Sequence, residues 1–300
     1  MEMNEIYLKA YGKINLALDV LRRREDGYHE VRMIMQTVDI FDSINIMKTD
    51  SGEIEIETNL FYLPVNENNI VYKAVKLLFD EFGIHSGLKI KLKKFIPVSA
   101  GMAGGSADAA SVMFGINKMF NLKLSKSQLM ERGVRIGADV PYCMMRGTAL
   151  SEGIGERLTA LPDVAKCPVL IAKPPVSVST KYVYENLDLD RIQKHPDIDG
   201  MIQAIRTADI RGVAGRMENV LESVTVREYP SIQLLKEMML EDNAMNALMS
   251  GSGPTVFGLF ENTDDAYRAK ERIKGSGITK QAYVTEFYSP AAKNHRQPKK

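Results

Sequence analysis

The segment Pro97-Val-Ser-Ala-Gly-Met-Ala-Gly-Gly-Ser-Ala-Asp-Ala-Ala110 decides how the rest of this sequence is interpreted. It follows an alternating apolar stretch, 88–92, that predicts a strand, and it leads directly into a helical pattern. Small residues let the backbone approach a ligand, and the free N–H groups at a helix start favour an anion. We therefore interpret the segment as a phosphate-binding loop; a flexible turn with tight helix packing is the alternative.

This loop is not one of the common nucleotide-binding motifs. It does not end in the Gly-Lys-Ser/Thr of a Walker A loop, and the chain has no Gly-x-Gly-x-x-Gly fingerprint. The His-Arg-Asp and Asp-Phe-Gly signatures of protein kinases are also missing. A nucleotide that binds here is therefore held in the manner of another family.

The composition is typical of a globular enzyme, with 45% hydrophobic and 26% charged residues in a chain of 300. It excludes a disordered chain, a collagen-like one and a disulfide-stapled mini-protein. A net charge of +1 gives no reason to expect a nucleic-acid partner. Two cysteines are too few for a disulfide framework or a structural zinc site. With no apolar run of membrane-spanning length and no signal-peptide pattern, we expect a cytoplasmic protein without a membrane partner.

The hydrophobic pattern predicts mixed helix and strand in both halves of the chain. Alternating or β-rich stretches predict strands over residues 6–20, 31–38, 44–47, 54–58, 88–92, 148–150, 169–172, 255–260 and 281–288. Helical periodicity predicts helices over 70–83, 107–120, 125–136 and 264–274, and over most of the second half up to Asn246. A proline-rich stretch places a domain boundary near residue 160, which gives domains 1–160 and 161–288. The basic end, 289–300, is expected to be a disordered tail.

Two charged residues lie in patterns that favour chemistry. Lys13 and Asn15 occur in a strand-like run, and period two puts both side chains on one face. A lysine there is most often a snorkelling edge residue; a catalytic lysine is the alternative. Asp139 lies in a tight turn bounded by Pro141. Its carboxylate either caps backbone or lies in a cleft, where a nearby lysine would keep it ionised and able to polarise a hydroxyl.

The remaining polar clusters indicate little by themselves. Tyr28 and His29 follow a basic run, and an exposed Tyr-His pair is usually only surface. The other histidines lack the spacing of metal ligands, so no metal ligand is assigned.

Together these segments resemble the GHMP kinase superfamily, which includes galactokinase, homoserine kinase and mevalonate kinase. Four motifs carry the resemblance in the family's order between residues 10 and 260: AYGKINLALDVLRRREDGYHEV, IPVSAGMAGGSADAA, IGADVPYCMMRGTALSEGIGE and MSGSGPTVFGLF. The resemblance implies an α+β, two-domain GHMP kinase fold. The N-terminal domain would be ribosomal-protein-S5-domain-2-like and the C-terminal domain α/β-plait-like, with the active site in the cleft between them.

The first and third motifs are typical of the members that act on a cytidyl substrate. They imply ATP-dependent phosphorylation of the 2-hydroxyl of 4-diphosphocytidyl-2-C-methyl-D-erythritol, in the non-mevalonate (methylerythritol phosphate) pathway of isoprenoid synthesis. Such an enzyme would use ATP with Mg²⁺, bind no nucleic acid, and act on its small-molecule substrate as a monomer or weak dimer.

The resemblance also implies roles for individual residues. Asp139 would be the general base, and Lys13 would hold the substrate hydroxyl and keep Asp139 charged. Tyr28 and His29 would hold the cytosine ring, and Tyr184 would supply the opposite aromatic face. The substrate residues as a whole are Asn15, Tyr28, His29, Thr180 and Tyr184. Asn69 and Lys94 would line the adenosine pocket. The other ATP residues, which would wrap the phosphates, are Pro97, Val98, Ser99, Ala100, Gly101, Met102, Ala103, Gly104, Gly105, Ser106 and Ala107.

One residue departs from the family's pattern. Many relatives have Ser-Ser where this chain has Ser106-Ala107. Because backbone N–H groups do most of the phosphate binding, we expect the missing hydroxyl to alter affinity rather than abolish activity. Position 107 cannot supply a metal ligand.

Three other functions fit the sequence less well. Another kinase of the superfamily, acting on homoserine or a mevalonate-type alcohol, would have no reason to carry the Gly-Tyr-His motif. A non-catalytic binding protein should have lost Lys13, Asp139 or the glycine loop, and all three are present. An RNA-binding role is disfavoured by the net charge near zero.

Overall fold

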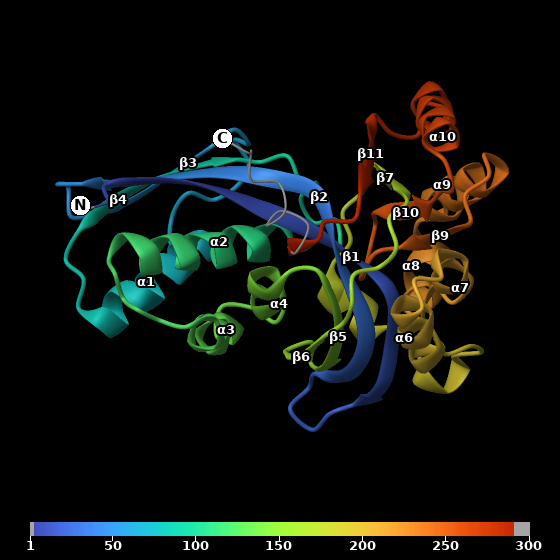
Figure 1. Cartoon of the computed structure of the whole chain (residues 1–300), viewed down its shortest axis with the longest axis horizontal. Helices are drawn as coiled ribbons and strands as arrows, with labels where there is room; N and C mark the ends of the chain where they lie inside the picture. The colour runs from blue at the N-terminus through green and yellow to red at the C-terminus, as the bar shows by residue number, and fades with distance from the viewer. Residues whose placement is uncertain (1–2, 291–300) are drawn as a thin grey trace. The chain divides into compact units, whose positions relative to one another are not determined.

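The computed structural model describes residues 3–290, which form two compact units. Unit 1 contains the chain up to Gly12 together with Ile40–Val98 and Ala103–Met145. Unit 2 contains Lys13–Asp39, Ser99–Met102 and the chain from Arg146 onward. Two long strands, β1 (Glu5–Arg23) and β2 (His29–Thr49), pass from one unit into the other (Figure 1).

Unit 1 is built on one end of these long strands. β2 pairs antiparallel with β4 (Gly87–Lys93), and β4 pairs parallel with β3 (Ile54–Thr58). The helices α1 (Ile70–Phe82) and α2 (Gly104–Met119) cover one face of this sheet (Figure 1). The approach of α2 is close: a Cβ added at Gly115 would lie 2.7 Å from the Ile46 side chain. A glycine therefore lets this helix pack directly on the sheet.

Two helices of unit 1 begin and end close to the predicted positions, at residues suited to capping. Asn69 caps α1 by accepting a hydrogen bond from the Val71 N–H, and Gly83 ends it with φ +59°. Ser125 opens α3 (Lys126–Val134) with a capping box. The helix α4 (Val140–Met145), which begins directly after Asp139, was not predicted.

Unit 2 contains a second antiparallel sheet in the order β11-β7-β10-β9. All residues of β7 (Pro168–Lys173) except its two end residues are buried, as expected for a central strand. Its partners are β11 (Gln281–Glu286) and β10 (Val256–Leu259), and β10 pairs with β9 (Asn246–Met249). The helices α9 (Pro230–Glu241) and α10 (Thr263–Gly275) pack against this sheet (Figure 1).

The remaining elements of unit 2 include three short strands. β5 (Thr148–Gly153) pairs with β2, β6 (Arg157–Ala160) pairs with β5, and β8 (Glu218–Asn219) runs parallel to β1. The other helical segments are α5 (Thr180–Glu185), a 3₁₀ turn (Leu189–Arg191), α6 (Ile198–Arg206), α7 (Ile210–Gly215) and α8 (Glu222–Glu228). Within residues 3–290, no helix has the length and apolarity needed to cross a membrane.

The α+β class is as predicted, with differences in detail. The strands predicted at 31–38 and 44–47 are one continuous strand, β2, which pairs with β5 over residues 31–36 and with β4 over residues 43–49. β6 and β8 were not predicted. The boundary near residue 160 stays a prediction; the two units divide the chain elsewhere, since β1 and β2 belong to both. Most of the predicted tail, including His295, lies outside the described residues.

Two glycines provide a test of the backbone at the helix ends. Gly83 has φ +59° and Gly275 ends α10 with an ordinary φ, and a Cβ at either position would meet nothing within 4 Å. Gly83→Ala should therefore lower the free energy of unfolding by about 1 kcal/mol, since only backbone strain is added. The matched variant Gly275→Ala should raise it by up to about 0.5 kcal/mol. Urea denaturation checks both signs; a loss of the same size in both variants would contradict the explanation.

Candidate active site

The helix α2, which follows the predicted phosphate loop, begins with exposed donor groups. Among the described residues, no side chain caps this helix, and its first turn contains no acidic residue. The first N–H groups of a helix have no partner within it, so an anion can bind there. The loop before it has left-handed backbone at Ser99, Gly101 and Ala103, with φ of +51°, +72° and +54°. Non-glycine residues in this region are uncommon and recur at functional sites.

In unit 1, Ser106 lies beside the segment that leads to Asp139. A Cβ added at Gly137 would be 3.9 Å from Ser106 Oγ and 3.8 Å from Ile70 Cδ1. The turn before Asp139 therefore runs along the first turn of α2. The Asp139 carbonyl accepts the first hydrogen bond of α4, from the Cys143 N–H at 3.0 Å, so the carboxylate stands at the start of that helix.

Both residues predicted to line the adenosine pocket are bonded inside the protein. The Asn69 side chain accepts from the Val71 N–H at 2.8 Å and donates to the Pro64 carbonyl at 2.7 Å. The Lys94 ammonium is buried and donates to the carboxylates of Asp42 and Asp108. A contact of Asn69 or Lys94 with adenosine stays a prediction.

In unit 2, Lys13 is buried with its ammonium in polar contacts, which excludes the snorkelling alternative. Its side chain donates to Asn15 Oδ1 at 2.7 Å and to the Gly101 carbonyl at 2.8 Å. Its backbone N–H donates to the Met102 carbonyl at 3.1 Å. Lys13 and Asn15 thus share a face of β1, as predicted, and both are tied to the middle of the phosphate loop.

The Ser-Gly-Ser-Gly turn, residues 250–253, also contacts the carbonyl group of Gly101. The hydroxyl of Ser250 donates to the Gly101 carbonyl at 2.9 Å. A Cβ at Gly251 would lie 3.4 Å from Lys13 Nζ and 3.5 Å from Asn15 Oδ1, so the turn lies directly against both residues. The hydroxyls of Ser252 and Thr180 are 2.9 Å apart, which brings the predicted substrate residue Thr180 to this turn.

Ser250 and Ser252 were not predicted as site residues. They lie in the fourth motif, MSGSGPTVFGLF, but nothing local in the sequence says that these serines contact residues 149 and 72 positions away. The alternation of serine with glycine is the one available signal, since small hydroxyl residues fit where two backbones approach closely.

The predicted cytosine residues also come together in unit 2. The rings of His29 and Tyr184 are 5.1 Å apart and tilted by 37°. Burial, and then the neighbouring positive charge of Arg23, lower the pKa of His29, so its ring is neutral at pH 7. Tyr28, on the turn before it, is 60% exposed. The Asp26 carboxylate holds this turn by accepting from the Tyr28 N–H at 3.1 Å and from the Arg24 guanidinium.

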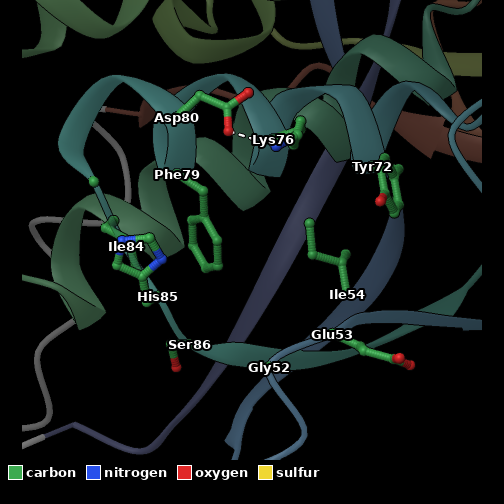
Figure 2. Close-up of a pocket in the computed structure, with 11 residues that line it drawn as sticks. Gly52, Glu53, Ile54, Tyr72, Lys76, Phe79, Asp80, Ile84, His85 and Ser86 are labelled. Atoms are coloured by element: carbon green, nitrogen blue, oxygen red, sulfur yellow. Dashed lines mark hydrogen bonds and ion pairs between the residues drawn. The ribbon is translucent and has the colours of Figure 1, made fainter.

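A separate hollow of about 840 Å³ lies in unit 1 between α1 and the segments that lead into β3 and β4 (Figure 2). None of the predicted site residues lines it. Lys76 and Asp80 at its rim pair with each other, so their charges are not directed at a ligand. Its lining consists of Gly52, Glu53, Ile54, Tyr72, Lys76, Phe79, Asp80, Gly83, Ile84, His85 and Ser86. Within residues 3–290, no three His, Cys, Asp or Glu side chains are grouped as a metal site.

Known proteins are similar to this chain over nearly its whole length. A 4-diphosphocytidyl-2-C-methyl-D-erythritol kinase of Lachnospira eligens is 55% identical over 96% of this chain and 100% of its own length. One from Lachnoclostridium phytofermentans is 56% identical over 95% of this chain and 98% of its own. The crystal structure of a 4-(cytidine 5'-diphospho)-2C-methyl-D-erythritol kinase superposes with a TM-score of 0.81 at 29% identity, covering 95% of this chain and 100% of that one.

The family models match two separate segments of the chain and confirm the GHMP kinase fold. Residues 69–147 match the GHMP kinases N terminal domain, which includes the phosphate loop and Asp139. Residues 194–279 match the GHMP kinases C terminal domain, which includes the Ser-Gly-Ser-Gly turn. With more than half of its residues identical to two kinases over nearly its full length, the chain belongs to the GHMP kinase family, among its 4-diphosphocytidyl-2-C-methyl-D-erythritol kinases.

Proposed function

We propose that this chain transfers the terminal phosphoryl group of ATP to the 2-hydroxyl of 4-diphosphocytidyl-2-C-methyl-D-erythritol, giving the 2-phosphate and ADP. It is a small-molecule kinase that uses ATP as co-substrate. The observation that carries the proposal is the buried Lys13 ammonium bonded to Asn15 and to the carbonyl of Gly101. Lysine is almost never buried without a reason, and this one lies on the loop that would hold phosphate.

Phosphoryl transfer requires positioning and charge neutralisation more than covalent help. The uncapped start of α2 offers backbone N–H groups to the phosphates of ATP. The Ser106 hydroxyl, half-buried on the first turn, would donate a hydrogen bond to a phosphate oxygen. When bound, Mg²⁺ would neutralise part of the charge on the phosphates.

Lys13 and Asp139 would act on the acceptor alcohol. In the described residues, two of the three N–H bonds of the Lys13 ammonium are used, and the third would be donated to the 2-hydroxyl. An alcohol is too weak an acid to be ionised outright by an aspartate. Asp139 therefore accepts the proton late, as the bond to phosphorus forms.

The cytidyl group would be recognised by aromatic and hydrogen-bonding contacts in unit 2. The neutral His29 ring can both donate and accept, which suits the polar edge of cytosine. Tyr28 and Tyr184 supply aromatic surface for stacking, and Tyr184 already lies against His29. Asn15 and Thr180 would contact the remainder of the substrate.

A coupled ADP-release assay with Mg-ATP tests the proposal directly. The acceptors are 4-diphosphocytidyl-2-C-methyl-D-erythritol, the same compound without its cytidyl group, homoserine and mevalonate. We expect turnover only with the cytidyl compound. Turnover with another alcohol would replace the substrate but keep the kinase, while silence on all four with ATP still bound would support a binding protein.

If Asp139 is the general base, replacing it should lower turnover without weakening ATP binding. Asp139→Asn keeps the shape of the side chain but cannot accept the proton. We expect kcat to fall by about 10²- to 10⁴-fold, with ATP affinity close to the original by calorimetry. The control is Asp50→Asn, an exposed carboxylate at the end of β2, which should leave both quantities unchanged. Near-native turnover of Asp139→Asn would refute the assignment.

The role of Tyr28 predicts a change in one KM only. Removing its ring should raise KM for the cytidyl substrate about tenfold through lost stacking, and leave KM for ATP within about twofold. Tyr7→Ala is the matched control, since Tyr7 is an exposed tyrosine in unit 1. Equal increases in the two KM values would remove Tyr28 from the cytosine site.

A further inference from the structure

Three charged side chains are buried together in unit 1 beneath the start of α2. Asp42 on β2 is 0% exposed, Asp108 on α2 is 3% exposed and Lys94, just after β4, is 8% exposed. The Lys94 ammonium donates to the carboxylates of both aspartates. Burying three ionisable groups is costly unless each is paired, so this triad is a specific feature of the fold.

The triad joins the two ends of the predicted phosphate loop. Lys94 lies three residues before Pro97, where the loop starts, and Asp108 directly follows Ala107, where it ends. Their ion pair therefore closes the loop at its base, across 14 positions of sequence. A loop whose ends are fixed to each other has fewer conformations to lose when a ligand binds.

The segment that carries Lys94 is itself fixed to the sheet. Oδ1 of Asp42 accepts hydrogen bonds from the Phe95 N–H and, at 2.8 Å, from the Ile96 N–H. Asn59 bonds both backbone groups of Lys94, accepting from its N–H at 2.7 Å and donating to its carbonyl at 3.1 Å. The backbone just before the loop is thus held by the side chains of Asp42 and Asn59.

The ammonium lies directly against the first residue of α2. A Cβ added at Gly104 would be 3.5 Å from Lys94 Nζ and 3.1 Å from Ile96 Cγ2. Any movement of Lys94 would therefore change the position of the helix start, whose free N–H groups face the phosphates in the proposed function.

The two carboxylates have different surroundings. Asp42 accepts hydrogen bonds from three donors, the ammonium and two backbone N–H groups. Asp108 accepts from the ammonium alone, and its Oδ1 is buried with no partner among the described residues. An ionised carboxylate needs donors on both oxygens, and a bare charged oxygen costs more than a bare neutral one. The negative charge therefore belongs on Asp42.

We propose that Asp42, Lys94 and Asp108 are positioning residues for the phosphate loop, with the charge on Asp42 and a proton on Asp108. The triad is then neutral as a whole, so it fixes the loop without adding negative charge beneath the phosphates. The positioning part rests on the proposed function, because it assumes that the loop binds ATP. The proton placement does not.

The pKa of Asp108 agrees with this placement. Burial raises it to about 8, against the opposing effect of Lys94 and with a further increase from Asp42, the two charged groups that face it. The ordinary value is 3.8, so the folded protein holds an extra proton between about pH 4 and about pH 8. The stabilising contribution is fully present below the lower value and is lost as the pH rises through the higher one.

Asp108→Asn tests where the proton is. An amide matches the protonated acid in shape and does not titrate, so the variant should lose this source of pH dependence. Between about pH 5 and about pH 9, the Tm of the original protein should fall relative to that of Asp108→Asn as the pH rises. Asp39→Asn, an exposed position on the same strand as Asp42, should follow the original profile. A constant difference in Tm across the range would overturn the proton placement.

Asp42→Asn tests the positioning. It leaves the ammonium without an ionised partner, so KM for ATP should rise about tenfold or more, and KM for the cytidyl substrate should change by less than about twofold. Asp108→Asn should raise KM for ATP less than Asp42→Asn does. Equal increases in both KM values, or none, would overturn the positioning role. If Asp42→Asn does not fold, Lys94→Gln takes its place. We expect the same result, a higher KM for ATP with little change in KM for the cytidyl substrate.

Calorimetry of ATP binding to the unaltered protein distinguishes a failure of the proposed function from a failure of the proton placement. No ATP binding there would contradict the proposed function, and with it the positioning role. The pH profile of Asp108→Asn would still decide the proton placement, because it measures folding and needs no ligand.

Discussion

The carbonyl oxygen of Gly101 is the point on which the arrangement of the site in unit 2 depends. It accepts hydrogen bonds from Lys13 on β1 and from Ser250 on the Ser-Gly-Ser-Gly turn, residues far apart in the chain. The approach is so close that a Cβ at Gly101 would lie 2.0 Å from the Ser250 carbonyl oxygen. Only glycine fits, and its φ of +72° also favours glycine. This one residue therefore holds the phosphate loop, the candidate catalytic lysine and the turn in one arrangement.

The two buried lysines of the site have opposite electrostatic settings. Lys94 is held by two carboxylates, and its charge is balanced inside the protein. Lys13 has only the neutral oxygens of Asn15 and Gly101 as side-chain partners among the described residues. A buried ammonium with neutral partners remains able to stabilise negative charge that develops on a substrate, whereas a balanced one does not. In the proposed function, Lys13 would therefore act on the substrate, and Lys94 would position the loop.

Much of the fold could be predicted because its signals are local. The strand at 54–58 and the caps Asn69, Gly83 and Ser125 each follow from a few adjacent residues. The triad could not be predicted, because its members are far apart and none has a motif. One signal was present: Asp42 shares the alternation of the buried residues Ile40, Ile44 and Ile46. Period two thus marks it as an inward-facing carboxylate in need of a partner.

The same reasoning explains how the loop can function without a second serine. The Ala107 side chain is 1% exposed, packed inside unit 1, while Ser106 before it is only half-buried. A hydroxyl at position 107 would need a hydrogen-bond partner within the protein before it could contact a phosphate. Alanine avoids that requirement and fits the apolar side of α2. In the proposed function, the loop would therefore use its hydroxyl at position 106, which is only half-buried, and rely on backbone N–H groups for the rest.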